Sequence, residues 1–450
     1  MRPRRAGTPG ALLFGRADSI MGPIPPAAHD GAPPRLKRSF QRKGASPMSL
    51  NETPRSERLH IGIFGRRNSG KSSLINALTG QKAAIVSDVP GTTADPVYKA
   101  MEICGVGPAV LIDTAGFDDE GGLGALRVGK TREAADRTDV ALMVFAGAAC
   151  PEELEWVGLL KAKGVPVIAV LNKIDRMSDG EREAALRSLK AATGSDAVPV
   201  SAANGEGVAA LREALLTALP EREDLSITGS LCRAGDTVVL VMPQDIQAPK
   251  GRLILPQVQT IRELLDKKCR ALCATSDGFA SALASLKEPP ALVIVDSQTF
   301  AEIYPQVPPG VKLTSFSILF AGYKGDIAAF AAGARALEKL TGRSRVLIAE
   351  ACTHAPLEED IGRVKIPRLL RKRFGAGLTI DFARGVDFPA DLGGYDVVIH
   401  CGACMFNRRF VLARIAEARR QGVPITNYGI ALAWLTGILD KVSLGAEARP

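Results

Sequence analysis

Residues 59–79 read LHIGIFGRRNSGKSSLINALT. In this stretch an apolar run leads into the pattern G-x-x-x-x-G-K-[ST], with Gly65, Gly70, Lys71 and Ser72 at the defined positions. Backbone N–H groups of such a glycine-rich loop surround phosphate oxygens, the lysine reaches the β and γ phosphates, and the hydroxyl binds Mg²⁺. The flanking runs predict a strand before the loop and a helix after it. We therefore expect a nucleotide-binding α/β domain.

Three later motifs define the nucleotide. The DTAG segment ends a second apolar run, so that the Asp113 carboxylate can hold the Mg²⁺ water shell and the Gly116 N–H can sense the γ phosphate. The NKID segment contains Asp175, whose carboxylate can accept from both N1–H and the amino group of guanine. Adenine offers neither donor, so the predicted ligand is GTP or GDP. The residues expected to bind it are Gly65, Asn68, Ser69, Gly70, Lys71, Ser72, Ser73, Asn172, Lys173, Asp175, Ser201 and Ala202.

The segment SDVPGTTADP at 87–96 has the features of a switch that closes on the nucleotide. Either of its two threonines can bind Mg²⁺ when the γ phosphate is present, and we expect Ser72 and Thr93 to be the protein ligands of Mg²⁺. The expected catalytic residues are Lys71, Thr92, Thr93, Asp113 and Gly116.

Together with GRRNSGKSSL, this switch resembles the family of GTPases that includes TrmE, Era and EngA. By that resemblance Asn68 binds a K⁺ ion that takes the place of an arginine finger, although Ala94 stands where the family usually has arginine. Phe117 follows DTAG, so the glutamine that positions water in Ras-like proteins is missing. We therefore expect slow, K⁺-stimulated hydrolysis. Three acidic residues are candidates for orienting the water: Asp118, Asp119 and Glu120.

The domain organisation follows from the alternation of short apolar runs with amphipathic stretches, which begins at Leu59. This alternation is typical of βαβ units and parallel sheets. It predicts a P-loop GTPase domain over 58–220, followed by two smaller α/β domains over 230–320 and 321–450.

Composition narrows the class of protein. The 450 residues have a net charge of +9, but residues 1–57 carry 10 Lys and Arg against 4 Asp and Glu. These residues also hold 9 of the 29 prolines, which predicts a disordered basic tail and not a targeting peptide. Most of the positive charge therefore lies outside the expected domains and indicates no nucleic acid partner. The 8 cysteines indicate a reducing cytoplasm, and no apolar run is long enough to predict a membrane span.

Two short segments concentrate cysteine and histidine. They read Cys352-Thr-His354 and His400-Cys401-Gly-Ala-Cys404, and each follows an apolar run. Because the carboxyl ends of parallel strands meet along one edge of a sheet, we expect these side chains at one site. Three thiolates suit an iron–sulfur cluster, or Zn²⁺ with a histidine as the fourth ligand. Core cysteines at strand ends are a third interpretation.

The other cysteines show no such pattern: Cys104, Cys150, Cys232, Cys269 and Cys273. A predicted helix over 260–272 and the residues after it place Cys269 and Cys273 on one helix face, which indicates packing.

The CxH and HCxxC segments behind this GTPase domain resemble the [FeFe]-hydrogenase maturation GTPases. The resemblance covers about 48–450 and is carried by NETPRSERLHI, VMPQDIQAPKGRLILPQVQTIRELLD, TSFSILFAGYKGD and ACTHAPLEEDIGRVKIP. It implies that the second domain forms a homodimer and that the third binds a [4Fe-4S] cluster through Cys352, Cys401 and Cys404. Three side chains can then occupy or flank the exchangeable fourth position: His354, His400 and Glu359.

The same resemblance implies a scaffold that receives a di-iron precursor from radical-SAM maturases and delivers it to apo-[FeFe]-hydrogenase. Two alternatives remain open. The GTPase domain alone fits a tRNA-modification or ribosome-assembly GTPase, but no basic GXXG module is evident. The cysteines alone fit a GTP-regulated adaptor with structural zinc.

Overall fold

The computed structural model describes residues 53–79, 96–103, 106–116, 122–219, 225–243, 253–351, 360–385 and 387–445. Residues Arg55–Glu57, which the sequence assigned to the tail, form a turn of 3-10 helix. No helix in the described ranges has both the length and the apolar character needed to cross a bilayer. The remainder of the predicted tail and several predicted site residues lie outside these ranges: Thr92, Thr93, Ala94, Phe117, Asp118, Asp119, Glu120, Cys352, His354 and Glu359.

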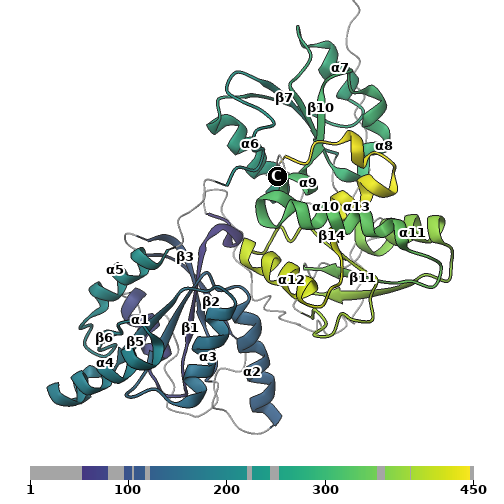
Figure 1. The fold of residues 1–450 in the computed structure, drawn as a ribbon. Helices are drawn as coiled ribbons and strands as arrows, with labels where there is room; N and C mark the ends of the chain where they lie inside the picture. Colours follow the sequence, from purple (N-terminus) through teal and green to yellow (C-terminus); the bar gives the residue numbers. More distant parts are fainter. Residues whose placement is uncertain are drawn as a thin grey trace, which may run out of the picture. The chain divides into compact units, whose positions relative to one another are not determined.

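The first domain is a six-stranded sheet with helices on both faces (Figure 1). Its strands are β1 (Leu59–Phe64), β2 (Val97–Ile103), β3 (Gly107–Asp113), β4 (Val140–Phe145), β5 (Val167–Asn172) and β6 (Val198–Val200). Their spatial order is β2-β3-β1-β4-β5-β6, with β2 antiparallel to β3 and all other pairs parallel. The helices are α1 (Lys71–Thr79), α2 (Gly122–Ala135), α3 (Pro151–Ala162), α4 (Asp179–Thr193) and α5 (Val208–Ala218).

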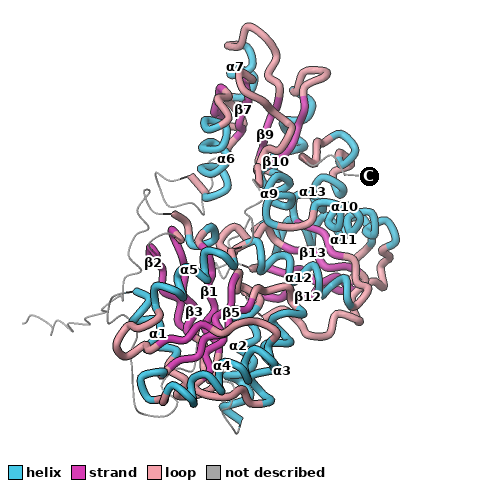
Figure 2. The backbone as a smooth tube through the Cα atoms, turned by 60° about the vertical axis from the view of Figure 1, so that its left-hand side comes forward, coloured by secondary structure: helices cyan, strands magenta, loops and turns pink. Residues whose placement is uncertain are grey.

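Two apolar layers hold this sheet between its helices. On one face Leu74 of α1 and Leu211 of α5 pack against the strands. On the other face Trp156 of α3 and Leu189 of α4 do so, together with the end of α2. Every residue of β4 is buried, as expected for a parallel strand that is covered on both sides. Figure 2 shows β1, β3 and β5 as strands of this sheet.

Strand β2 was not predicted from the sequence. Only Ile103 of its seven residues is buried, and it lies at the edge of the sheet. An edge strand of this kind needs no continuous apolar run, so the pattern that marks the central strands is missing.

The second domain is a four-stranded parallel sheet of order β10-β9-β7-β8. Its strands are β7 (Thr237–Val241), β8 (Arg270–Ala274), β9 (Leu292–Val295) and β10 (Lys312–Ser315). Leu264 and Phe320 cover one face of the sheet, and Phe279 and Phe300 cover the other. Its helices are α6 (Leu255–Asp266), α7 (Phe279–Ala284), α8 (Phe300–Ile303) and α9 (Phe316–Lys324).

The helix expected over 260–272 is wrong in its second half. Helix α6 ends at Asp266, and the chain turns through Lys268, whose φ is +59°, into strand β8. Cys269 therefore precedes the strand and is buried, whereas Cys273 lies within it and is exposed. The apolar residues of 270–274 fit a helix or a strand equally well, and parallel pairing with β7 decides for the strand.

The third domain is a second four-stranded parallel sheet, of order β12-β11-β13-β14. Its strands are β11 (Arg345–Glu350), β12 (Thr379–Arg384), β13 (Val397–His400) and β14 (Ile425–Asn427). The chain leaves β11 toward β12 on one side and returns to β13 on the other. The carboxyl ends of β11 and β13 therefore form the topological switch point, where open α/β sheets bind ligands. The helices are α10 (Ile327–Ala336), α11 (Ile366–Phe374), α12 (Arg408–Arg420) and α13 (Tyr428–Leu435).

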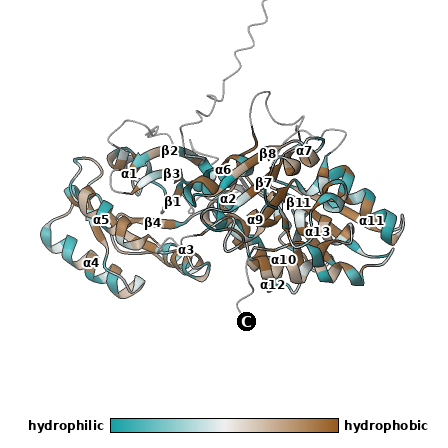
Figure 3. Ribbon diagram, turned by 90° about the horizontal axis from the view of Figure 1, so that it is seen from above, coloured by the Kyte–Doolittle hydropathy of each residue, from teal (hydrophilic) through white to brown (hydrophobic). Residues whose placement is uncertain are grey.

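The second and third sheets share one apolar core. Val239 and Phe300 of the second domain belong to the same buried cluster as Leu347, Val398 and Phe410 of the third. Hydrophilic residues are found on the helices α4 and α11, which carry teal stretches in Figure 3. The buried cluster, by contrast, joins the second and third sheets. The two smaller domains are therefore packed into one another.

Candidate functional site

The glycine-rich loop joins β1 to α1 at the carboxyl edge of the first sheet. Lys71 is only 8% exposed, and its ammonium donates to the carbonyl oxygens of Gly65 and Arg66 at 2.9 and 2.8 Å. Gly65 has φ +149°, and a Cβ there would meet the Val144 carbonyl and the Ser69 hydroxyl. The loop therefore keeps its lysine folded over its own backbone, at the place where phosphates would bind.

Ser72 and Asp113 lie next to each other below this loop. The Ser72 hydroxyl donates to the Asp113 carboxylate at 2.8 Å. Burial raises the pKa of Asp113, while the Ser72 hydrogen bond and the nearby Lys71 oppose that rise. Hydroxyl and carboxylate oxygens are the ligands that Mg²⁺ prefers, so this pair fits the predicted metal position.

Asn172 connects the phosphate loop to the two base loops. It is 1% exposed, donates to the Ser69 carbonyl at 2.9 Å and accepts from the Ala202 N–H at 3.1 Å. Gly70 has φ +95°, and a Cβ at this position would run into the Asn172 amide. Glycine is therefore required at residue 70 by both its conformation and its neighbour.

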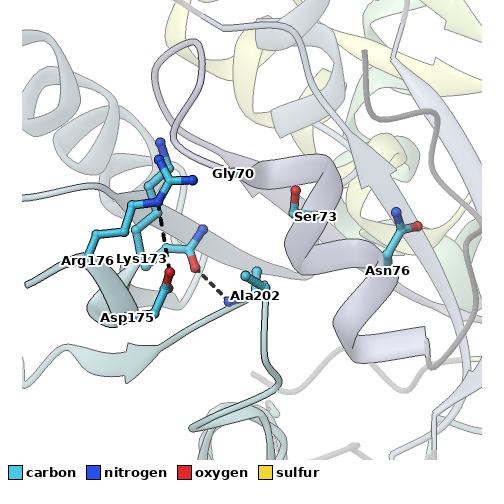
Figure 4. A pocket seen from close by; sticks show the side chains of 9 residues that line it. Gly70, Ser73, Asn76, Lys173, Asp175, Arg176 and Ala202 are labelled. Atoms are coloured by element: carbon cyan, nitrogen blue, oxygen red, sulfur yellow. Dashed lines mark hydrogen bonds and ion pairs between the residues drawn. The ribbon is translucent and has the colours of Figure 1, made fainter. Parts of the chain in front are cut away.

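Asp175 is oriented by a second bridge between the base loops. The Ser201 hydroxyl, which is fully buried, donates to one carboxylate oxygen at 2.6 Å. The other oxygen lies 3.9 Å from Arg176 Nε. Asp175 and Arg176 line a pocket of about 260 Å³, which Figure 4 shows with their ion pair and the Ala202 contact dashed. The sequence analysis missed three residues of its lining: Asn76, Arg176 and Ala203.

Asn68 and Lys173 both adopt left-handed backbone conformations, with φ of +57° and +64°. The Lys173 ammonium donates to the Asn68 carbonyl at 2.5 Å, which links the phosphate loop to NKID. Asn68 is exposed. Asparagine tolerates this conformation better than most residues, so its presence has a structural reason besides any ion.

The cysteine loop follows β13 at the switch point of the third sheet. The Cys401 sulfur accepts from the N–H of Ala351 at 3.0 Å and from the N–H of Ala403 at 3.4 Å. Ala351 directly follows β11, so the end of this strand lies beside Cys401. Ala403 has φ +46°, which is costly for a residue with a Cβ. The structure thus places the carboxyl end of β11 next to the Cys401 loop.

Lys324 supports this loop from the second domain. It is 2% exposed, and its ammonium donates to the carbonyl oxygens of Cys404 and Phe406, both at 2.9 Å, and of Ala403 at 3.4 Å. These charge-assisted hydrogen bonds stabilise the strained backbone conformation of the cysteine loop.

Arg408 makes the reverse contact from the first turn of α12. Its guanidinium donates to the carbonyl oxygens of Tyr323 at 2.9 Å, Gly325 at 3.0 Å and Gly322 at 3.4 Å. These carbonyls belong to the end of α9, where helix carbonyls lack partners and the dipole favours cations. The second and third domains therefore each contribute one charged side chain that donates to backbone carbonyl oxygens of the other domain.

His400 is fully buried and uses both ring nitrogens on protein atoms. Nδ1 lies 2.6 Å from the Cys401 carbonyl oxygen, and Nε2 lies 3.0 Å from Arg414 Nη1. Arginine can only donate, so Nε2 accepts and Nδ1 carries the proton. Burial, with Arg414 nearby, lowers the pKa of His400 to about 3, which keeps the ring neutral. His400 therefore lies behind the loop, where it positions Cys401.

No group of three metal-ligating side chains occurs among the residues that the structure describes. Cys401, Cys404 and His400 are described, and the other predicted cluster ligands, Cys352, His354 and Glu359, lie outside these residues. The two thiols, one with two N–H donors aimed at its sulfur, have the soft-donor chemistry of an iron–sulfur or zinc site. The described half of the site therefore fits the predicted cluster.

Family models match three consecutive parts of the chain. Residues 227–325 match the hydrogen maturase F dimerization domain, and residues 328–444 match the hydrogen maturase F tetramerization domain. The chain belongs to the hydrogen maturase F family. Residues 60–173 match a 50S ribosome-binding GTPase. The hydrogen maturase F fold thus consists of a P-loop GTPase domain, a dimerization domain with the second sheet and a tetramerization domain with the third.

Relatives of the GTPase domain are found outside the hydrogen maturase F family. GTPase Der of Wolinella succinogenes is 37% identical over 176 residues, which are 37% of this chain and 37% of Der. The tRNA modification GTPase MnmE of Paraburkholderia xenovorans is 40% identical over 162 residues, which are 36% of this chain and 34% of MnmE. The chain spans about a third of the length of these curated relatives. A crystal structure of Aquifex aeolicus Era bound to GDP and AlF4⁻ is 22% identical, with a TM-score of 0.34, and covers 48% of this chain and 92% of that chain.

The hydrogen maturase F cysteine loop depends on residues that no motif identifies. Lys324 precedes the loop by more than 75 positions and contacts only backbone atoms there, so its partners leave no trace in the sequence. Arg414 lies in the amphipathic helix α12, where an arginine is expected to be solvated, yet it is 5% exposed. Its ring neighbours Phe388 and Phe410, at 4.7 and 4.3 Å, explain how the guanidinium is accommodated.

Proposed function

We propose that this chain is a GTP-hydrolysing scaffold of hydrogenase maturation. It carries a [4Fe-4S] cluster and a di-iron precursor, and it delivers the precursor to apo-[FeFe]-hydrogenase. The observation that carries the proposal is the position of Cys401 and Cys404 at the switch point of the third sheet, beside the end of β11. The two hydrogen maturase F domains and the GTPase domain of the same chain support it.

Cys352, Cys401 and Cys404 would hold the cluster. When bound, it supplies an iron atom with an exchangeable position, because three cysteines leave one iron without a thiolate. The N–H groups of Ala351 and Ala403 stabilise a thiolate at Cys401. Since His400 is engaged on both ring nitrogens, we propose His354 or Glu359 for the fourth position.

The GTPase domain would act as a switch on partner binding. Lys71 neutralises the β and γ phosphates, Ser72 and Asp113 hold Mg²⁺, and Thr92 or Thr93 closes on it. Gly116 senses the γ phosphate and Asp175 selects guanine. GTP turnover then governs when a partner binds or leaves.

The proposed partners are radical-SAM maturases, which supply the di-iron precursor, and apo-[FeFe]-hydrogenase, which takes it. We place this exchange in the cytoplasm, where free thiols persist. A homodimer formed through the second domain is part of the proposal, supported by the dimerization domain at 227–325.

Anaerobic purification tests the cluster directly. We expect a brown protein whose iron and sulfide are lost in Cys401→Ala, because that substitution removes one of three ligands. The matched control is Cys273→Ala, which changes an exposed cysteine of β8 and should keep its iron. A colourless protein that contains one zinc would contradict the cluster and support the zinc adaptor.

A cell-free maturation assay tests the scaffold role. Cys401→Ala and Lys71→Ala should each fail to activate apo-hydrogenase, whereas Cys273→Ala should activate it like the unmodified chain. If either of the first two variants activates hydrogenase at the unmodified level, the roles assigned here are wrong.

Potassium is expected to accelerate GTP hydrolysis over sodium at equal ionic strength, because the ion would take the place of an arginine finger. Asn68→Gly should remove this response, since glycine keeps the left-handed backbone at φ +57° and deletes only the side chain. Steady-state phosphate release in the two salts measures the effect. A full potassium response in Asn68→Gly would exclude Asn68 as the ligand.

A further inference from the structure

Tyr428 lies near Cys401 at the carboxyl edge of the third sheet. Ala349 of β11 pairs with His400 of β13, and His400 pairs with Asn427 of β14. One residue further, Cys401 directly follows β13 and Tyr428 is the first residue of α13. Both residues therefore leave the sheet at the same edge, and Tyr428 lies within electrostatic range of Cys401 and Glu350.

The Tyr428 hydroxyl makes no hydrogen bond to any residue that the structure describes. Its oxygen is buried and has no hydrogen-bond partner in the part of the chain that the structure describes, although the ring is partly exposed. A buried hydroxyl without a partner costs stability and calls for an explanation, such as a ligand or ion that completes it.

Gly362 makes room for this hydroxyl. It belongs to the short π-helix Ile361–Lys365, and a Cβ at this position would collide with the Tyr428 oxygen. The charged neighbours are already paired: Glu350 accepts from Arg363 at 2.8 Å, and Asp360 accepts from the Arg363 N–H at 2.8 Å. They leave the tyrosine proton available.

We propose that Tyr428 is a positioning residue whose hydroxyl donates a hydrogen bond to a sulfur of the iron–sulfur group held by Cys401. The inference rests on the cluster of the proposed function. An ordinary tyrosine hydroxyl, with a pKa of about 10, keeps its proton at neutral pH and can therefore act as a donor. Hydrogen bonds to cluster sulfurs help to set the reduction potential, and a donor raises it because it stabilises the more negative, reduced cluster.

Tyr428→Phe tests the proposal because it deletes only the oxygen. In the cluster-free protein the unfolding temperature should stay the same or rise, since a buried unpartnered hydroxyl is removed. In the reconstituted full chain, the ratio of reduced to oxidised cluster at a fixed potential should fall about two- to tenfold, the equivalent of one hydrogen bond. The EPR spectrum of the reduced cluster should change as well.

Tyr395→Phe is the matched control in the same domain. Its hydroxyl already bonds to Asp381, so its loss should leave the cluster ratio and the EPR spectrum unchanged. Gly362→Ala displaces the Tyr428 hydroxyl without deleting it and should shift the cluster ratio in the same direction as Tyr428→Phe.

The outcomes separate the two claims. An unmodified chain that takes up no cluster overturns both the proposed function and this inference. An unmodified chain with a cluster, together with a Tyr428→Phe variant of identical ratio and spectrum, overturns the inference alone. A lower unfolding temperature of cluster-free Tyr428→Phe would also overturn it, because the hydroxyl would then have a structural partner.

Discussion

Asp175→Asn is expected to lower the affinity for GTP by about 10²–10⁴-fold and to raise the affinity for XTP, because two hydrogen bonds to a charged carboxylate, worth about 1.5–3 kcal/mol each, are lost. Guanine presents two donors to the carboxylate, and the asparagine amide would turn a donor of its own toward one of them. Xanthine carries an oxygen where guanine has its amino group, and this oxygen can accept a hydrogen bond from the asparagine amide. The Ser201 hydroxyl, 2.6 Å from the carboxylate, can still donate to the asparagine oxygen, which should preserve the loop.

Competition titration of a fluorescent nucleotide by GTP and XTP measures both affinities. Asp179→Asn is the matched control, because that carboxylate is 94% exposed at the start of α4 and lies outside the pocket lining. An Asp175→Asn protein that still prefers GTP over XTP would show that the guanine edge is read elsewhere.

Lys71→Ala is expected to weaken GTP binding by about 10- to 10⁴-fold, from the loss of one or two charge-assisted hydrogen bonds to phosphate at about 1.5–3 kcal/mol each. The carbonyls of Gly65 and Arg66 would also lose a donor, so the phosphate loop should become less ordered without nucleotide. Isothermal titration with GTP and Mg²⁺ measures the first effect, and the unfolding temperature without nucleotide measures the second.

Lys190→Ala is the control for Lys71, because that ammonium pairs with Asp196 on the surface of α4 and contributes little. The control should bind GTP like the unmodified chain. Equal affinities in Lys71→Ala and Lys190→Ala would mean that Lys71 serves the fold of the loop and not the phosphates.

Features that depend on local sequence could be predicted. The strand, loop and helix at 59–79 follow from one motif, because glycines, lysine and hydroxyl act within a few residues. The approach of the ends of β11 and β13 was also predictable, since parallel strands end at one edge of the sheet.

Features that depend on distant backbone could not be predicted. Residues 270–274 form a strand because β7 pairs with them, and nothing in their own pattern excludes a helix. Lys324 supports the cysteine loop through carbonyl oxygens, which every sequence provides equally. The role proposed for Tyr428 depends on its position directly after β14, near Cys401, and on an oxygen without a hydrogen-bond partner among the described residues.

The exchange of Lys324 and Arg408 between the second and third sheets has an evolutionary consequence. A boundary between the dimerization and tetramerization domains, drawn at residues 325–328, separates the lysine from the carbonyls that it holds. A gene fusion that acquired the tetramerization domain alone would receive the cysteines without their support. The two domains should therefore be inherited together, and chains that recombine between them should lose the cysteine loop's conformation before they lose either fold.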